Sequence, residues 1–450
     1  MRSPFRHDLD LKVKPTQTAG SDDSNPATVQ PPKTGYESNK LVEGINAISH
    51  KVIPICFRIW LGHLVMEAKR PKTRNILKSI ARRRRRAADR ESEVALEIDD
   101  SSYSRRRVTW SRRRFIKFHL YPEIRAEKKR RPRHPTIEEV DAAKIRASRF
   151  RKFTHGTVII RDSTNNGQII AVVEFTPLSE LSPADKEEVN SITTYLHQMK
   201  QFVHPIGPSR TWGGRMWGVG WRKSMTRSEL FGQYVKSAAI KRSPKKYKEL
   251  VNRSRGVANT LGRMFRDLGG VAFESNQEMM RKHGIPSFGS TEFRAPSGPY
   301  PYDCAPHITF TSHGFFNCPH VDLGDASQWA FALFVPTKTI DGTLADRDEG
   351  YNVTGGCFAF PDYDCCIDFG QQGLVKLIWA ANRVKHCTLP ADESPKFTRM
   401  AMSLQIPRKT TTTCNKIKSG LIYLKDSYKK RKNSYIGGHR AIMNKLGCTF

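Results

Sequence analysis

The chain has 450 residues, of which 38% are hydrophobic, and a formal net charge of +33 at pH 7. That length allows two or three domains, and the hydrophobic fraction is low for a chain that folds throughout. About half of the positive excess lies in residues 1–150, so polyanions, and nucleic acid first among them, are the expected partners. The nine Cys residues show no disulfide framework and no secretory signal opens the sequence, so we expect free thiols in a reducing compartment.

Composition predicts that residues 1–145 are a basic and largely disordered region. Residues 1–40 are rich in Ser, Pro, Thr and Gln and have little to bury, whereas residues 41–80 could form a helix. The apolar run at 52–66 is shorter than the roughly 20 residues that cross a bilayer, and it contains Arg58. We therefore expect no membrane anchor.

Blocks of basic residues follow at 81–90, 104–107, 111–115 and 128–133. Such runs cannot pack in a core, so one interpretation is a solvated tail. The functional interpretations are a nuclear import signal and an arm that binds nucleic acid without reading its sequence. One segment can serve both purposes, because each needs only exposed positive charge, and we predict a nuclear protein.

The folded domain is expected to span residues 146–450. Two β-rich runs around an Asn-Asn-Gly turn predict a hairpin over 155–175. Ser182 has the character of a helix N-cap, and residues 243–268 form the longest helix candidate. Residues 207–224 predict a Gly-rich loop with three Trp residues, which either pack beneath the loop or form a surface on which bases stack.

After residue 300 the sequence changes to short β-rich runs separated by Gly, Pro and Asp. Many short strands at close spacing indicate a jelly roll, or double-stranded β-helix, with its core at about 300–410. Together with the helices predicted before it, this makes an α+β fold. The runs are 307–313, 328–335, 355–360, 364–369, 373–381 and 397–406.

Four residues in this block have the spacing of an iron site. His320 and Asp322 lie between the first two predicted strands, His386 follows the fifth, and Arg399 lies in the sixth. Two imidazoles and a carboxylate can occupy one face of octahedral Fe(II) and leave positions for 2-oxoglutarate and O2. An Arg fork suits the second carboxylate of that five-carbon co-substrate. The order of the four residues is the layout of Fe(II)- and 2-oxoglutarate-dependent oxygenases.

At these residues the sequence resembles the TET/JBP group of nucleic-acid base oxygenases, and most of all the Tet-like 2-oxoglutarate–Fe(II) oxygenase domains of fungal genomes. The resemblance spans roughly residues 150–410 and implies iron at His320, Asp322 and His386, with 2-oxoglutarate at Arg399. The stretches that carry it are "HGTVIIRD", "MWGVGWRKS", "DCAPHITFTSHGFFNCPHVD", "WAFALFVPT", "GLVKLIWAANRVKHCTLPADESP" and "TRMAMSLQI".

The resemblance also implies a substrate-binding position and shows two departures. Members of the group often place a polar residue that contacts cytosine three positions after the iron Asp, which here is Asp325. That residue could instead be an ordinary turn Asp. Members that oxidise 5-methylcytosine often have a His eight positions after the Arg, where this chain has Pro407. Many oxygenases have a Ser two positions after the Arg, where this chain has Ala401.

The sequence favours an Fe(II)- and 2-oxoglutarate-dependent dioxygenase that hydroxylates the methyl group of 5-methylcytosine or thymine in DNA. Such a base would have to be flipped out of the duplex. A second hypothesis is a non-catalytic nucleic-acid-binding protein of a mobile element that has kept its jelly roll. A third keeps the chemistry but takes RNA or protein as the substrate.

Overall fold

The computed structural model describes residues 108–124, 132–207, 211–224, 226, 228–233, 235–294, 300–370, 373–424 and 434–450. The chain divides into two compact units at residue 74, and every described residue belongs to the second. The expectations for residues 1–107, among them the helix at 41–80, lie outside the described part. Among the described residues, the helices are too short or too polar to span a membrane.

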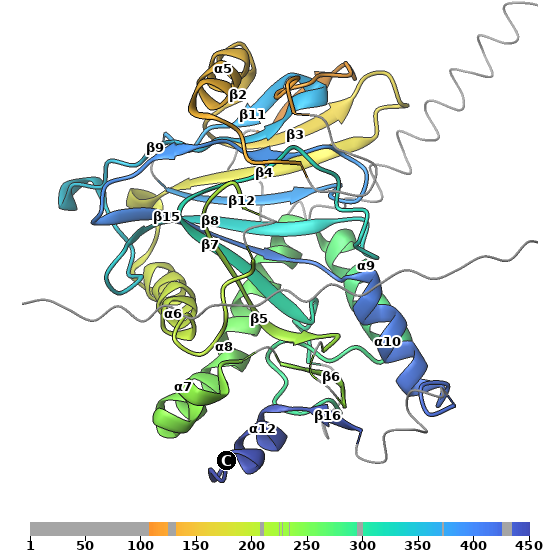
Figure 1. The fold of residues 1–450 in the computed structure, drawn as a ribbon. Helices are drawn as coiled ribbons and strands as arrows, with labels where there is room; N and C mark the ends of the chain where they lie inside the picture. Colours follow the sequence, from red (N-terminus) through yellow and green to blue (C-terminus); the bar gives the residue numbers. More distant parts are fainter. Residues whose placement is uncertain are drawn as a thin grey trace, which may run out of the picture. The chain divides into compact units, whose positions relative to one another are not determined.

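A large sheet forms the centre of this unit (Figure 1), with strand order β1-β3-β4-β12-β8-β15-β7-β5-β6-β16. Its neighbours pair antiparallel except at its two edges, where β1 runs parallel to β3 and β16 parallel to β6. The strands are β1 (Val108–Arg113), β3 (Thr157–Asp162), β4 (Ile169–Pro177), β5 (Gly213–Arg222), β6 (Glu229–Gln233), β7 (His307–Phe316), β8 (Ala330–Lys338), β12 (Gly373–Trp379), β15 (Phe397–Leu404) and β16 (Tyr435–Gly437).

A smaller sheet has the order β13-β10-β11-β2. It consists of β2 (Arg151–Phe153), β10 (Phe358–Phe360), β11 (Cys365–Ile367) and β13 (Cys387–Thr388), and a separate pair joins β9 (Thr354–Gly355) to β14 (Ala391–Asp392). The chain passes between the two main sheets repeatedly: β7 and β8 are in the large sheet, β10 and β11 in the small one, and β12, β13 and β15 alternate. This winding is the predicted jelly roll, and the strands β1 to β6 and β16 extend its two sheets.

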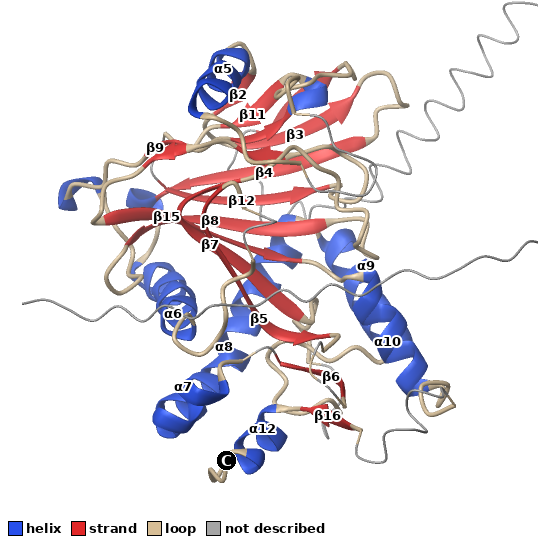
Figure 2. Cartoon of the chain, in the orientation of Figure 1, coloured by secondary structure: helices blue, strands red, loops and turns tan. Residues whose placement is uncertain are grey.

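The helices are segregated from the strands (Figure 2), which makes the fold α+β as predicted. They are α5 (Ile137–Ser148), α6 (Pro183–Met199), α7 (Ser237–Arg242), α8 (Pro244–Leu268), α9 (Gly270–His283), α10 (Arg408–Lys418) and α12 (His439–Lys445), and short 3-10 turns lie at Leu178–Glu180, Arg347–Glu349 and Pro361–Tyr363. Ser182 caps α6 and forms a capping box with Asp185, as its sequence indicates.

The domain has layers of helices and sheets, and each pair of neighbouring layers shares a hydrophobic core. Side chains of α6, α8 and α9, such as Leu196 and Phe265, pack with Phe331 and Met400 of the large sheet. The opposite face of the large sheet packs on the small sheet. Burying each large apolar side chain in these layers contributes about 1.5–3 kcal/mol to the free energy of folding. This burial stabilises the packing of the helices on the large sheet and of the two sheets on each other.

The outer face of the small sheet is covered by the region before residue 148. Leu120, Tyr121 and Ala147 pack against Ala359 and Cys366 of that sheet. The prediction that residues 81–135 lack a packed core is therefore wrong for the described residues 108–124. The physical reason is that the small sheet has apolar side chains on both faces and needs a second cover.

The predicted domain boundary at residue 146 lies too late for the same reason. Strand β1 runs parallel to β3, from the pair Val108–Thr157 to the pair Arg113–Asp162, and α5 begins at Ile137. Arginines fit an edge strand because alternate side chains point to opposite faces, and the guanidinium groups reach solvent while the backbone makes the ladder.

The predicted Gly-rich loop at 207–224 is mostly strand β5. Trp217 is 4% exposed and Trp221 is buried completely, and each stacks on a Phe ring of the core. Trp212 packs edge-on against Tyr121. Packing is therefore the correct interpretation of these Trp residues, and a base-stacking surface at Trp217 and Trp221 is ruled out.

Candidate functional site

Two backbone segments bring the candidate metal residues together at one end of the jelly roll. His320 and His386 exchange both backbone hydrogen bonds, with N–O distances of 3.0 and 2.9 Å. The Asp322 N–H donates to the Ala381 carbonyl at 2.9 Å, which fixes the next turn. The loop after β7 is thereby tied to the loop after β12, although the two are more than sixty residues apart in the sequence.

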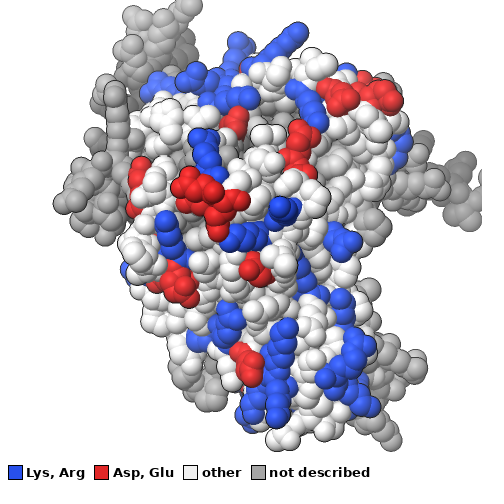
Figure 3. All heavy atoms as spheres, turned by 90° about the vertical axis from the view of Figure 1, so that its left-hand side faces the viewer, with Lys and Arg blue, Asp and Glu red and all other residues white. Residues whose placement is uncertain are grey.

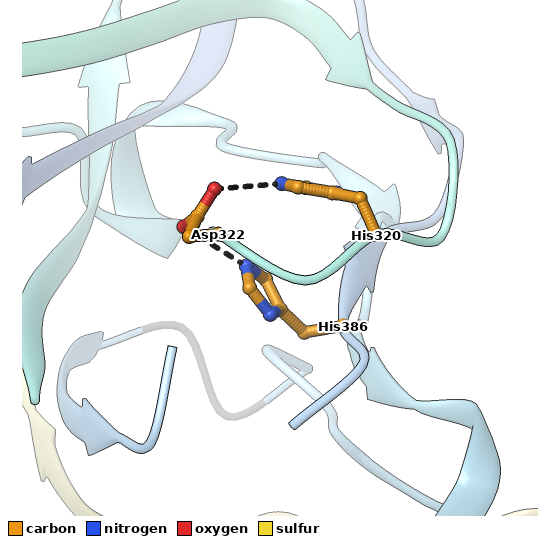
Figure 4. A group of neighbouring side chains, drawn as sticks. All are labelled: His320, Asp322 and His386. Atoms are coloured by element: carbon orange, nitrogen blue, oxygen red, sulfur yellow. Dashed lines mark ion pairs between the residues drawn. The ribbon is translucent and has the colours of Figure 1, made fainter. Parts of the chain in front are cut away.

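The three side chains converge on one point (Figure 4). The His320 Nε2 lies 3.4 Å from Asp322 Oδ1, and the His386 Nε2 lies 3.5 Å from Asp322 Oδ2. One ligand atom of each residue lies within 4.8 Å of the others, as in a site for one metal ion. Within the described part of the chain, no other group of three or more His, Cys, Asp or Glu side chains comes this close together.

The tautomers of both imidazoles suit metal binding. The Nδ1 of His320 lies 2.8 Å from the Cys318 carbonyl, and the Nδ1 of His386 lies 2.9 Å from the Val384 carbonyl. A carbonyl can only accept, so each Nδ1 carries the proton and each neutral ring directs the Nε2 lone pair at Asp322. A second partner that orients a ligating His in this way is typical of metal sites.

The electrostatics favour a cation at this point. Burial acts to raise the pKa of the Asp322 carboxyl, but without a metal the protonated rings of His320 and His386 would donate to it, and their hydrogen bonds and charge hold that pKa far below its ordinary value. Burial lowers the pKa of His386 and the neighbouring His320 lowers it further, so the neutral ring is favoured. Two lone pairs and a carboxylate that face one another are stable only around a positive charge, which a divalent metal supplies.

Gln405 contacts this group, although the sequence offered no reason to single it out. Its Nε2 donates to Asp322 Oδ2 at 2.8 Å. It follows β15 directly, and alternate residues of that strand share a face. Met400 and Met402 point to the helices and Ala401 to the space between the sheets, so Gln405 is on the same face as Ala401. The two-residue period of a β-strand would have placed Gln405 on this face once Ala401 was known to lie on it.

Arg399 lies on that inner face of β15 as well, but not within the three-residue group. Its Nη1 donates to the Gly355 carbonyl at 3.0 Å, and its guanidinium lies 4.5 Å from the centre of the Phe369 ring. The space beside it, walled by Tyr351 and Phe334 among others, is about 10 Å³. A guanidinium has five N–H donors, so the contacts of Nη1 with the Gly355 and Gly356 carbonyls leave donors for a carboxylate.

Asp325 is 9% exposed and follows the candidate ligands in a tight turn, where its N–H donates to the Asp322 carbonyl at 3.0 Å. It forms an isolated antiparallel bridge with Pro407, and Arg408 Nε donates to its carbonyl at 2.9 Å. The two positions that the resemblance associates with the target base are thus direct neighbours. The contact of the Asp325 carboxylate with a base stays a prediction.

The comparisons with known proteins agree with this geometry. Residues 182–391, a little under half of the chain, match the model of the Tet-like 2OG-Fe(II) oxygenase superfamily. The match contains His320, Asp322 and His386 and ends before Arg399. Among curated proteins, none matches the chain.

Similar solved structures include NgTET1 in complex with 5mC DNA, at 14% identity over 60% of this chain and 88% of that one, with a TM-score of 0.33. A Pseudomonas putida prolyl-4-hydroxylase matches at 10% identity over 53% and 93%, with a TM-score of 0.26. An oxidoreductase of the 2OG-Fe(II) oxygenase family from Burkholderia pseudomallei matches at 9% over 53% and 87%, with a TM-score of 0.27. These likenesses are distant, so the strand order and the family model carry the assignment.

The cofactors of this superfamily are Fe(II) and 2-oxoglutarate, and the His-Asp-His group fits the iron by donor type, tautomer and convergence. The chain therefore carries a domain of the Tet-like 2OG-Fe(II) oxygenase superfamily and is an Fe(II)- and 2-oxoglutarate-dependent dioxygenase.

Proposed function

We propose that this dioxygenase hydroxylates the methyl group of a pyrimidine base, 5-methylcytosine or thymine, in DNA. The observation that carries the proposal is the convergence of His320, Asp322 and His386 in a Tet-like domain. The strongly basic composition of the chain supports a polyanionic substrate. One of the similar solved structures is described as a complex with 5mC DNA.

In this proposal His320, Asp322 and His386 would hold Fe(II), and Arg399 would hold the outer carboxylate of 2-oxoglutarate. With O2 as co-substrate, the bound pair would supply the oxidising power to place one oxygen atom in a C–H bond of the methyl group and the other in succinate, with release of CO2. The protein orients the ligands through the Cys318 and Val384 carbonyls and through Gln405.

Aromatic side chains shield the distal histidine. The Phe358 ring stacks on His386 with centroids 5.5 Å apart, and Trp379 lies edge-on at 5.4 Å. Water is excluded from that side of the imidazole, which strengthens electrostatic interactions at the site. We propose that Asp325, beside Pro407, contacts the exocyclic amine of the target cytosine through its carboxylate.

The test is mass spectrometry of nucleosides after the full chain is incubated with Fe(II), 2-oxoglutarate and methylated DNA. We expect hydroxymethylated pyrimidine in step with succinate. Asp322→Ala should abolish both products and reduce the iron content of the purified protein, because two imidazoles alone hold Fe(II) weakly. The control is Asp348→Ala, which removes an exposed carboxylate of the 3-10 turn Arg347–Glu349, outside the His-Asp-His group.

Other outcomes separate the alternatives. Succinate release that only RNA or a protein stimulates would move the substrate to that class. DNA binding with no succinate release under any condition would leave the non-catalytic binding protein. We also propose that the enzyme is nuclear, because its DNA substrate and the basic block at 81–90 suit that compartment; a fluorescent fusion with and without that block tests this.

A further inference from the structure

The described part of the basic N-terminal region runs beside the candidate iron site. Residues 108–119, called the basic strap from here on, comprise β1 and the segment after it. The Ile116 and Phe118 N–H groups donate to Asp362 at 2.7 and 3.0 Å. Lys385 Nζ donates to the same Asp362 carboxylate at 2.7 Å and to the Phe118 carbonyl at 3.4 Å. The strap is thereby fixed to the residue that precedes His386.

Arg113 of the strap pairs with Asp364 at 3.4 Å, but three other basic residues of the strap have no acidic partner within the described part of the chain. Arg112, Arg114 and Lys117 are exposed and form no ion pair there. Trp110, which precedes them in β1, is 55% exposed, and the Arg161 guanidinium lies 4.4 Å from its ring centre. The face at the β9 and α6 side of the molecule (Figure 3) is different, since acidic and basic side chains are mixed on it.

A cavity of about 350 Å³ opens between the strap, the β3–β4 turn and the loop that carries His386. This volume is within the range of small-molecule sites, roughly 300–1,000 Å³. Its wall includes Phe115 of the strap, Tyr363 and Arg383, and also Val384, whose carbonyl orients His386. The cavity is therefore adjacent to the catalytic end of the jelly roll.

The lining favours a flat, uncharged group that can form hydrogen bonds. Phe115 is 48% exposed and meets Tyr363 edge-on, with centroids 5.7 Å apart. The Asn165 Nδ2 donates to the Gln168 Oε1 at 3.1 Å, which leaves the Asn165 Oδ1 as an acceptor and the Gln168 Nε2 as a donor on the wall. Arg383 contacts Gln168 Oε1 at 2.7 Å.

The buried carboxylate of Asp162 argues against a phosphate inside the cavity. It already accepts from Thr164, Asn165 and the Tyr363 hydroxyl. Its negative charge lies in the wall and would repel an anion at short range. Anionic groups of a ligand are instead favoured outside, along the arginines of the strap.

We propose that this cavity binds an unstacked nucleobase of the DNA substrate, a neighbour of the oxidised base, while Arg112, Arg114 and Lys117 hold the adjoining phosphodiesters. The identity of the polymer rests on the proposed function. The base stacks on the exposed Phe115 ring, meets the Tyr363 ring edge-on, and forms hydrogen bonds with the amides of Asn165 and Gln168. Stacking accepts any base, so the site contributes affinity and position rather than sequence choice.

The first test is fluorescence anisotropy with a labelled oligonucleotide that contains 5-methylcytosine. The full chain is titrated with Fe(II) and 2-oxoglutarate under anaerobic conditions, so that binding is measured without turnover. We expect Phe115→Ala to weaken binding about tenfold, the value of one lost stacking contact. The matched control is Ile116→Ala, an adjacent strap residue that is 51% exposed and does not line the cavity.

The second test shows whether DNA affinity depends on the cations of the strap or on the net charge of the protein. A triple variant with Gln at Arg112, Arg114 and Lys117 should reduce the slope of log affinity against log salt by about 2 to 3 on duplex DNA. The matched control carries the same charge change on exposed residues of α7 and the start of α8, which are Lys241, Arg242 and Lys245. Its slope should be nearly that of the unmodified chain.

The third measurement does not depend on a variant that folds. Oligonucleotides with 5-iodouracil beside the methylated base should photo-crosslink to Phe115 or Tyr363, as mapped by mass spectrometry. Unchanged affinity of a folded Phe115→Ala variant, or crosslinks only elsewhere, would overturn the proposal. An acidic peptide that binds the strap as tightly as DNA would do so too, because the surface would then be a protein-docking site.

These outcomes are independent of the proposed function. If the unmodified chain oxidises DNA while Phe115→Ala binds it normally, the cavity proposal fails and the function stands. If DNA is never oxidised but the variant loses affinity, the cavity proposal stands and the function fails.

Discussion

At the scale of single residues, the site depends on hydrogen bonds that fix each ligand before a metal binds. His320 and His386 are held by carbonyls two residues earlier in the chain, so their orientation is a local property. Asp322 is different, because its side-chain partner Gln405 is 83 residues away and follows β15. The carboxylate is therefore the ligand whose position depends on the whole jelly roll.

Gln405→Leu should weaken Fe(II) binding about tenfold without removing a ligand, because outer partners of metal ligands contribute roughly 10- to 100-fold to affinity. Leu keeps the approximate volume but cannot donate to Asp322 Oδ2. The measurement is titration of the metal-free protein with Fe(II) under anaerobic conditions. Gln201→Leu, a surface change with no link to the site, is the control, and equal affinities for the two variants would refute the role of Gln405.

Arg399→Lys should raise the KM for 2-oxoglutarate at least about tenfold while kcat changes less. A Lys supplies one point charge where the guanidinium offers a planar fork to a carboxylate. Steady-state kinetics with succinate as the readout separates the two parameters. Arg266→Lys on α8 is the control. A variant that loses kcat but keeps its KM would show that Arg399 does not bind the co-substrate.

At the scale of elements, the basic strap shows how one segment can satisfy two requirements. Its backbone completes the edge of the large sheet, and the residues that follow cover the small sheet with Leu120 and Tyr121. Its charged side chains remain exposed beside the cavity that Phe115 lines. Removing this segment would therefore remove a structural cover and the proposed binding surface together.

A truncated chain that begins at residue 146 should therefore be less stable than one that begins at residue 104. The shorter chain loses β1, α5 and buried Leu120, Tyr121 and Ala143, and each of the two large side chains contributes about 1.5–3 kcal/mol. Urea unfolding should show a loss of at least about 3 kcal/mol. Equal unfolding free energies would mean that the cover of the small sheet is dispensable.

At the scale of the whole molecule, buried histidines couple stability to pH. His439 of α12 is 4% exposed, and its Nδ1 lies 2.7 Å from the Tyr247 hydroxyl of α8. Burial lowers the pKa of His439 from 6.5 to about 4. The unfolded chain therefore binds a proton at a higher pH than the folded chain does, and acid favours unfolding.

The free energy of unfolding should fall by about 3 kcal/mol for this group as the pH drops from about 6.5 to about 4. Above pH 6.5 the contribution is constant, because the ring is neutral in both states. His439→Phe is expected to be less stable at pH 7.5 but to lose less stability on acidification. Urea unfolding of both proteins at pH 7.5 and pH 5 checks this, and parallel losses would contradict it.

The sequence by itself determined the features that depend on local patterns. The order of His320, Asp322 and His386 among short β-rich runs indicated both the jelly roll and the candidate iron site, because strand period and ligand type are properties of short segments. The helix cap at Ser182 is of the same kind. Arg399 was placed on its strand correctly, although the strand alone could not say what its guanidinium contacts.

Only the tertiary structure decided which segments cover one another. Composition treated 111–115 as a solvated basic run and 207–224 as a loop, yet the first belongs to the edge of the sheet and the second is largely a buried strand. Gln405 reaches Asp322, and Phe115 reaches Tyr363, across distances in sequence that no local pattern records. The physical reason is that burial and hydrogen bonding are settled between layers, so a segment's partner, rather than its own composition, determines whether it packs in the core or faces solvent.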